Sequence, residues 1–123
     1  MIEMKVLVVD DAPFILKAVR EILEAYGNEV FEAVNGEEAV SVFQEVRPDV
    51  VLMDILMPKL DGVGATRKIM EIDSQAKIIV ITAVGKHGLE KECMAAGARD
   101  FIVKPFKTKD LLKAMESMEE NDI

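Results

Sequence analysis

Five polar residues stand directly after short apolar segments of this 123-residue sequence, and their types suit one another chemically. The adjacent pair Asp10 and Asp11 follows VLVV, Asp54 follows VVLM, Thr82 follows IIVI, and Lys104 follows FIV. Two neighbouring carboxylates raise each other's cost of ionisation unless a cation or a cationic side chain compensates them. The acidic pair therefore predicts a metal ion or a lysine nearby.

Together the five residues meet the needs of phosphoryl transfer to a carboxylate. Oxygen ligands with open positions suit Mg²⁺ or Mn²⁺, and Mg²⁺ usually binds one or two carboxylates and keeps several waters. Asp54 beside such a cation is a candidate nucleophile that would form an aspartyl phosphate. Lys104 supplies a mobile positive charge and Thr82 a hydroxyl, and both can stabilise charge on the phosphoryl oxygens. Each residue alone is more often a turn, cap or surface residue, so the prediction rests on their combination.

The elements that must position these residues alternate between strand and helix. Five β-branched-rich segments are too short for helices and are predicted strands: residues 6–9, 30–34, 50–53, 78–81 and 101–103. Apolar residues at helical spacing follow each of them, and Gly27 and Gly97 stand where two helices should stop. Strands separated by helices pair in parallel through right-handed crossovers, so helices should cover both faces of the sheet.

The hydrophobicity of the segments predicts the order of the strands. The first, third and fourth are apolar throughout, as strands buried on both faces are. The second carries Glu29 and Glu32, and the fifth is short and follows Arg99 and Asp100, so both are expected at the edges. These features predict a doubly wound α/β fold, with a five-stranded parallel sheet in the order 2-1-3-4-5 flanked by five helices, as in flavodoxin-like proteins. Ligands bind such sheets at the carboxyl ends of the strands, where the five polar residues stand.

The size and composition are those of one globular domain, expected to span residues 1–123. The net charge is −8 with Lys and Arg scattered along the chain, which argues against direct binding to nucleic acid. No segment is apolar for long enough to insert into a membrane, and no signal peptide precedes the first strand. The single cysteine, Cys93, cannot form an internal disulfide, so a cytoplasmic protein is expected.

Four stretches, VLVVDDAPF, DVVLMDILMPKLDG, IIVITAVG and GARDFIVKPF, resemble the receiver domains of two-component response regulators, in particular the single-domain chemotaxis (CheY) type. They follow the family's order and spacing, and the resemblance spans essentially the whole chain. It implies that Asp54 accepts a phosphoryl group from a sensor histidine kinase, and that Lys104 contacts that group. It also implies that Asp11 and Asp54 bind Mg²⁺ directly. Asp10 would contribute through water or directly, and the backbone carbonyl of Leu56 would be a further ligand.

The resemblance also implies a switch that follows phosphorylation. Thr82, with Ala83 beside it, would move toward the phosphoryl oxygens, and Phe101 would turn inward into the space left. This would repack the face formed by the fourth helix, the fifth strand and the fifth helix, where partner proteins commonly bind. Many relatives carry tyrosine at the position of Phe101, so partner contacts through that hydroxyl are not expected here.

Further residues around the predicted site are expected to shape its loops or tune its chemistry. Pro58 should stiffen the loop that follows the nucleophile, and the resemblance implies a cis Lys104–Pro105 bond. Leu56 and Val84 lie two residues beyond the nucleophile and the hydroxyl, at positions that in this family influence how fast water attacks the phosphoryl group. Both are apolar and cannot orient a water molecule by hydrogen bonding, so slow intrinsic dephosphorylation is expected.

The chain is therefore expected to be a phosphorylation-controlled binding module that catalyses only its own phosphorylation and dephosphorylation. Its expected partners are a sensor histidine kinase and a downstream protein, either a motor switch or a relay protein. The alternative is a phosphorelay intermediate or a receiver domain cut from a longer regulator.

Three other interpretations are less consistent with the sequence. An aspartyl-nucleophile phosphatase would carry its nucleophile after the first strand, in a D-x-D arrangement. An FMN carrier would need a hydroxyl- and glycine-rich phosphate loop there, where Asp10 and Asp11 repel phosphate. A receiver that docks constitutively, without phosphorylation, would not need the full set of site residues.

Overall fold

The computed structural model describes residues 3–57, 59–83 and 87–120, with the side chains of residues 87, 88 and 120 left aside. Five strands alternate with five helices along these residues. The strands are β1 (Lys5–Val9), β2 (Glu29–Ala33), β3 (Val50–Met53), β4 (Ile78–Thr82) and β5 (Asp100–Val103). The helices are α1 (Pro13–Ala25), α2 (Gly36–Val46), α3 (Gly62–Ile72), α4 (His87–Ala96) and α5 (Thr108–Glu120).

The strands form one parallel sheet in the order β2-β1-β3-β4-β5, which confirms the predicted order and both predicted edges. In the register of the sheet, Val9 lies opposite Met53, and Thr82 lies opposite Val103. The next residues on each strand therefore leave the sheet side by side. Asp10 emerges beside Asp54, and Ala83 beside Lys104.

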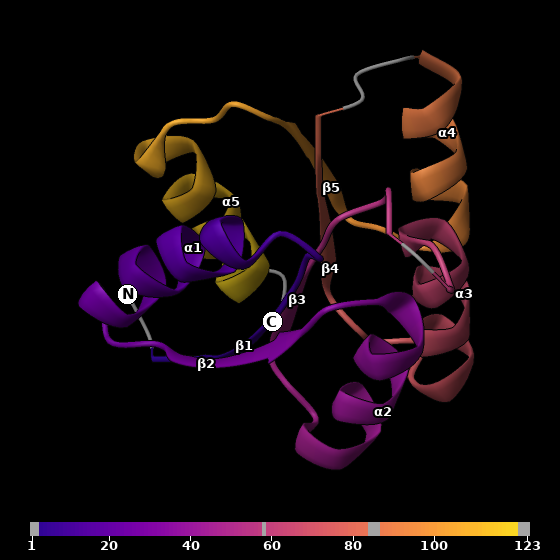
Figure 1. Cartoon of the computed structure of the whole chain (residues 1–123), viewed down its shortest axis with the longest axis horizontal. Coiled ribbons are helices and arrows are strands. Elements are labelled where there is room, and N and C mark those ends of the chain that lie inside the picture. Colours follow the sequence, from indigo (N-terminus) through magenta and orange to yellow (C-terminus); the bar gives the residue numbers. More distant parts are fainter. Residues whose placement is uncertain (1–2, 58, 84–86, 121–123) are drawn as a thin grey trace.

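Helices cover both faces of the sheet, with α1 and α5 on one side and α2, α3 and α4 on the other (Figure 1). Successive residues of a strand point to opposite faces. Accordingly, Val6 and Val8 belong to the core beneath α1 and α5, whereas Leu7 and Val9 belong to the core beneath the other three helices. This double burial explains why the inner segments are apolar at every position.

Particular residues begin and end the helices. Asn35 caps α2 with its side-chain oxygen, which accepts a hydrogen bond from Glu38 N at 2.8 Å. Asp61 caps α3 in the same way through Gly64 N at 2.8 Å. Gly27 and Gly97 follow the ends of α1 and α4 with φ of 87° and 120°, a region that residues with a Cβ rarely enter. The helix ends predicted at Gly27 and Gly97 are confirmed.

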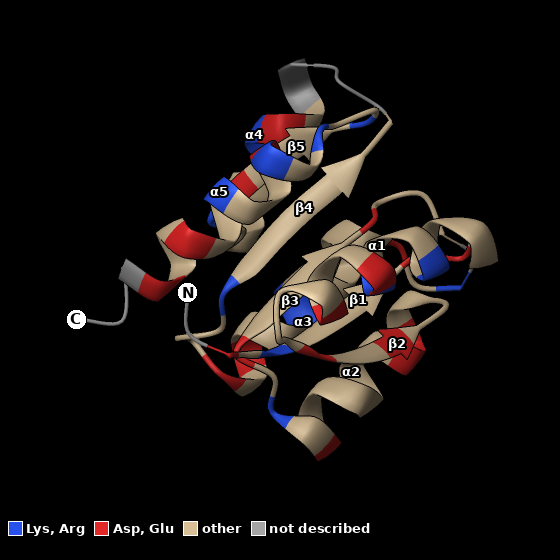
Figure 2. Cartoon of the chain, turned by 90° about the vertical axis from the view of Figure 1, so that its left-hand side faces the viewer, with Lys and Arg blue, Asp and Glu red and all other residues tan. Residues whose placement is uncertain are grey.

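Acidic and basic residues are interspersed along the helices in Figure 2. Within the described part of the chain, no helix has both the length and the apolar character needed to cross a membrane.

Candidate functional site

Three carboxylates meet at the carboxyl edge of the sheet, between β1 and β3. Each of Asp10, Asp11 and Asp54 contributes one oxygen to a cluster in which these atoms lie within 4.8 Å of one another. The backbone that carries them continues the sheet, because Asp10 N donates to Ala33 O at 3.1 Å and Asp54 N donates to Val9 O at 3.0 Å. Asp10 and Asp54 are buried and Asp11 is exposed, so the cluster opens to solvent on the side of Asp11. The predicted acidic pocket is therefore present.

Lys104, which follows β5, supplies the positive charge that was predicted near the acidic pair. Its Nζ lies 2.7 Å from Asp10 Oδ2 and 3.8 Å from Asp54 Oδ1. Its backbone N donates to Thr82 O at 2.7 Å, which joins the ends of β4 and β5. The bond to Pro105 is cis, as the resemblance implied. A lysine from the far edge of the sheet thus compensates two buried carboxylates.

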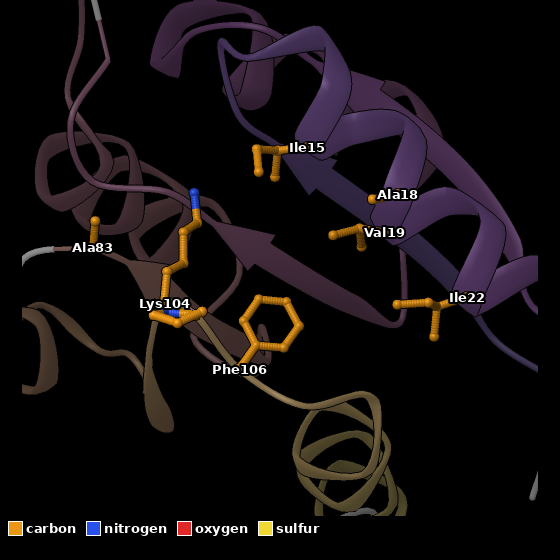
Figure 3. A pocket seen from close by; sticks show the side chains of 8 residues that line it. Ile15, Ala18, Val19, Ile22, Ala83, Lys104 and Phe106 are labelled. Carbon is orange, nitrogen blue, oxygen red and sulfur yellow. The ribbon is translucent and has the colours of Figure 1, made fainter.

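Lys104 lines an apolar groove of about 390 Å³ between α1 and the segment after β5. Figure 3 shows Lys104 between Ala83 and Ile15, with Phe106 facing Val19 and Ile22 across the groove. Ala18 and Pro105 complete the lining. Since a lysine stem packs well on apolar surface, the methylene chain forms part of the groove wall while the ammonium lies at the carboxylates.

The donor set fits a hard divalent cation such as Mg²⁺. Mg²⁺ prefers carboxylate, carbonyl and water oxygens, and it binds through few carboxylates. Asp10 already uses both oxygens, because Oδ1 accepts from Ala12 N at 2.9 Å and Oδ2 accepts from Lys104. The oxygens of Asp11 and Asp54 are therefore better placed for direct coordination than those of Asp10, which can reach the ion through water.

The surroundings of Asp54 raise the pKa of its carboxyl above the ordinary value. The pKa of its carboxyl is raised from 3.8 to about 6, chiefly by burial and next by the negative charge of Asp10. Lys104 and a hydrogen bond with the backbone of Ile55 act against this, whereas Asp11 adds a smaller increase. Without a bound cation, folding therefore imposes a cost on the ionised form of Asp54.

Removing that ionised carboxylate should stabilise the metal-free protein. A rise in pKa from 3.8 to about 6 corresponds to at most about 3 kcal/mol, and access of water to the site reduces this cost. We expect Asp54→Asn to raise the free energy of unfolding by about 1–2 kcal/mol at pH 7.5 in EDTA. The native pKa is the higher one, so the parent should gain stability as the pH falls from above 6 toward 4. The variant should lose this part of the dependence.

Urea denaturation at several pH values measures the effect. Glu71→Gln, at an exposed position of α3, removes one negative charge from the surface and serves as the control. Equal stability of Asp54→Asn and the parent at pH 7.5 would contradict the assigned cost of burial.

The other residues predicted for the site lie around this cluster. Thr82 is fully buried at the end of β4, and Ala83 is exposed and lines the groove with Lys104. Leu56, two residues after Asp54 in the sequence, is 61% exposed. Phe101 is half-buried against the core on the side of α2, α3 and α4. Pro58 and Val84 lie outside the described residues.

Sequence reasoning missed the backbone contacts that hold the loop after Asp54. Gly62 N donates to Ile55 O at 2.9 Å, and Gly36 N donates to Leu60 O at 3.0 Å. It also missed Phe106, which lines the groove together with Lys104. The available signal for the glycines was their place immediately after the cap residues Asn35 and Asp61, where a helix starts against a neighbouring loop.

Comparison with known proteins defines the class to which this fold and site belong. The model of the response regulator receiver domain matches residues 6–116. The chain belongs to that family, whose members are regulatory signalling proteins that generally bind Mg²⁺ at an acidic pocket.

Within the family, the chain is of the CheY type. It is 45% identical over 115 residues to the chemotaxis protein CheY of Thermotoga maritima, across 93% of this chain and 96% of that protein. A crystal structure of the CheX–CheY–BeF3–Mg²⁺ complex from Borrelia burgdorferi has a TM-score of 0.88 and 40% identity, covering 92% of this chain and 87% of that one. The receiver domain of a sensor histidine kinase from Pseudomonas aeruginosa, solved with a magnesium ion in its active site cleft, has a TM-score of 0.88 and 31% identity, covering 95% of this chain and 98% of that one.

Proposed function

We propose that this chain is a single-domain response regulator that accepts a phosphoryl group on Asp54 from a sensor histidine kinase. The observation that carries the proposal is the convergence of three carboxylates and Lys104 at one edge of the sheet. The similarity to CheY proteins over most of both chains supports a role in chemotaxis or motility. Two alternatives use the same phosphoryl-transfer chemistry: a phosphorelay intermediate, or the receiver domain of a longer regulator.

In the proposed reaction, an oxygen of the Asp54 carboxylate attacks the phosphorus of the donor. A new O–P bond forms while the P–N bond to the donor's histidine breaks, and the imidazole leaves with the bonding electron pair and is protonated. Bound Mg²⁺ would neutralise charge on the phosphoryl oxygens during this transfer. Lys104 would reach the same oxygens with its ammonium by moving from Asp10, and Asp11 and Asp54 would hold the cation.

The proposed output is a change in partner binding at the face formed by α4, β5 and α5. Thr82, at the end of β4, would turn its hydroxyl toward the phosphoryl oxygens, and the backbone of Ala83 would contact them. Phe101 is half-buried on the neighbouring strand, so it can occupy the space that Thr82 leaves. The downstream protein that binds this face would be a motor switch or a relay protein.

Intact mass after incubation with acetyl phosphate and Mg²⁺ tests the proposal. We expect the parent to gain one phosphoryl group, while Asp54→Asn and the parent in EDTA gain none. An absence of gain in the parent, repeated with a phosphorylated histidine kinase, would overturn the proposal and favour a constitutive docking module. Gain in Asp54→Asn would assign the nucleophile to another residue.

The phosphorylated parent should lose its phosphoryl group slowly. Leu56 is 61% exposed and apolar, so its side chain cannot orient an attacking water. We expect Leu56→Asn to accelerate hydrolysis roughly tenfold, which is less than the roughly 10²–10⁴-fold of a general acid or base, because an amide orients water without taking its proton. The time course of intact mass after removal of the donor measures the rate.

Leu56→Met, which preserves the apolar character, is the matched control for that measurement. A Leu56→Asn variant that dephosphorylates no faster than the parent and the control would contradict this role.

A further inference from the structure

Helix α2 carries none of the predicted site residues, yet its first residue touches the loop that follows Asp54. Gly36 N donates to Leu60 O at 3.0 Å. A Cβ placed on Gly36 would lie 2.1 Å from Leu60 O and 2.7 Å from Leu60 C. These are backbone atoms that cannot turn aside, so the two segments approach as closely as they do only because residue 36 has no side chain.

The end of α2 that makes this contact is itself held firmly. Asn35 Oδ1 accepts from Glu38 N at 2.8 Å, and Glu38 Oε1 accepts in return from Val34 N at 3.0 Å. This reciprocal arrangement resembles a capping box, which fixes the path of the chain as it enters a helix. These two hydrogen bonds therefore fix the position of the Gly36 N–H at the start of α2.

The loop on the other side of the contact is fixed at both ends and at Leu60. At its start, Asp54 N is bonded to β1, and Ile55 O accepts from Gly62 N at 2.9 Å. At its end, the cap formed by Asp61 holds the first turn of α3. The side chain of Leu60 packs against the core beneath α2, α3 and α4. The contact with Gly36 is thus an anchor from outside the site on the short segment that contains Leu56.

We propose that Gly36 is a positioning residue for the Mg²⁺ site, acting through Leu60 on the loop that carries Asp54 and the carbonyl of Leu56. This inference rests on the proposed function, because it assumes that the loop helps to bind the ion. Mg²⁺ demands near-ideal octahedral geometry, so a carbonyl displaced by roughly 1 Å is a poor ligand. Some residues orient the metal ligands without touching the ion. Replacing such a residue commonly weakens metal binding about 10- to 100-fold.

The first test compares Gly36→Ala with Gly97→Ala by calorimetric titration with MgCl₂. Gly97 has φ of 120°, and a Cβ there would lie 2.5 Å from Met70 Cγ, so its substitution also destabilises the fold. It stands between α4 and the amino end of β5, at the opposite edge of the sheet from the carboxylates. We expect the dissociation constant for Mg²⁺ to rise roughly tenfold in Gly36→Ala and to stay at the parental value in Gly97→Ala.

Phosphorylation by acetyl phosphate gives a second readout with the same variants. The Mg²⁺ concentration for half-maximal rate should rise in Gly36→Ala, while the rate at saturating Mg²⁺ stays close to that of the parent. An unchanged Mg²⁺ affinity in Gly36→Ala, or an equal loss in both variants, would overturn the positioning role. A parent that binds no Mg²⁺ would overturn the proposed function as well.

Amide hydrogen exchange in the unaltered protein keeps the inference testable if Gly36→Ala does not fold. Coupling between two sites is reciprocal, so a contact that favours Mg²⁺ binding must itself be strengthened by Mg²⁺. We expect saturating Mg²⁺ to slow exchange of the Gly36 amide roughly tenfold. The Gly97 amide, which donates to Met94 O at 3.1 Å, should not change. Equal exchange of the Gly36 amide with and without Mg²⁺ would overturn the coupling.

Discussion

Lys104→Met is expected to lower the free energy of unfolding of the metal-free protein by about 2 kcal/mol. Removing one partner of a fully buried ion pair costs about 3–5 kcal/mol, because the remaining charge stays buried without compensation. The side chain of Lys104 is 19% exposed and that of Asp10 is 6% exposed, so water moderates the loss here. The loss of the Lys104 charge should also push the pKa of Asp54 further above its value of about 6, since Lys104 opposes that rise.

The same substitution should make the protein bind Mg²⁺ more tightly. Lys104 and the ion compete for the same negative charge, so removing the ammonium leaves a more negative site. Because Mg²⁺ binds the folded state, it raises the free energy of unfolding by mass action. This increase should be larger in Lys104→Met than in the parent. Phosphorylation should nevertheless fall roughly a hundredfold, because the ammonium no longer stabilises the phosphoryl oxygens.

Urea denaturation in EDTA and in MgCl₂, with intact mass for phosphorylation, measures these three effects. Lys17→Met removes an exposed lysine of α1 and controls for the change in net charge. A Lys104→Met variant as stable as Lys17→Met in EDTA would show that the ion pair with Asp10 does not compensate the buried acids.

The fold was predictable because its strongest signals are local and repeated. Each inner strand is apolar at every position, and the structure shows the cause in the alternation of its residues between two cores. The acidic residues Glu29 and Glu32 marked β2 as an edge strand, which the sheet order confirms. Pattern alone placed the ends of strands within one residue, since strand termini depend on pairing with neighbours as well as on side-chain type.

The sequence predicts which residues meet at the candidate site, but it does not predict how those residues are held in place. Parallel topology brings the ends of β1, β3 and β5 to one edge, so Asp10, Asp54 and Lys104 could be placed together from sequence. The sequence does not say that Lys104 pairs more closely with Asp10 than with Asp54, which depends on side-chain packing in the groove beside α1. Nor does it reveal that Gly36 touches Leu60, because that contact joins the backbones of two segments distant in sequence.

Gly62→Ala should impair both folding and phosphorylation through one contact. A Cβ on Gly62 would lie 2.1 Å from Asp54 O and 2.7 Å from Ile55 Cα. The φ of Gly62 lies outside the left-handed region, so alanine fits the backbone there and the cost arises from the collision alone. Alanine would otherwise favour a helix by about 1 kcal/mol relative to glycine. We expect a net loss of about 3 kcal/mol in the free energy of unfolding, since overpacking against immobile backbone forces the chain to shift.

The shift must occur where Asp54 leaves β3, so the proposed nucleophile moves with it. A displacement of about 1 Å can slow a positioned reaction roughly a hundredfold. Gly64→Ala is the matched control in the same helical turn, because its Cβ would meet side-chain atoms instead of backbone. These are Leu60 Cδ1 at 2.7 Å, a terminal methyl that can turn aside while Leu60 stays against the core, and Asp61 Oδ1 at 3.3 Å. We expect Gly64→Ala to keep the parental stability and rate within a small factor, as measured by urea denaturation and intact mass. If Gly62→Ala folds as stably as Gly64→Ala and is phosphorylated as fast, the close contact with Asp54 does not position the nucleophile.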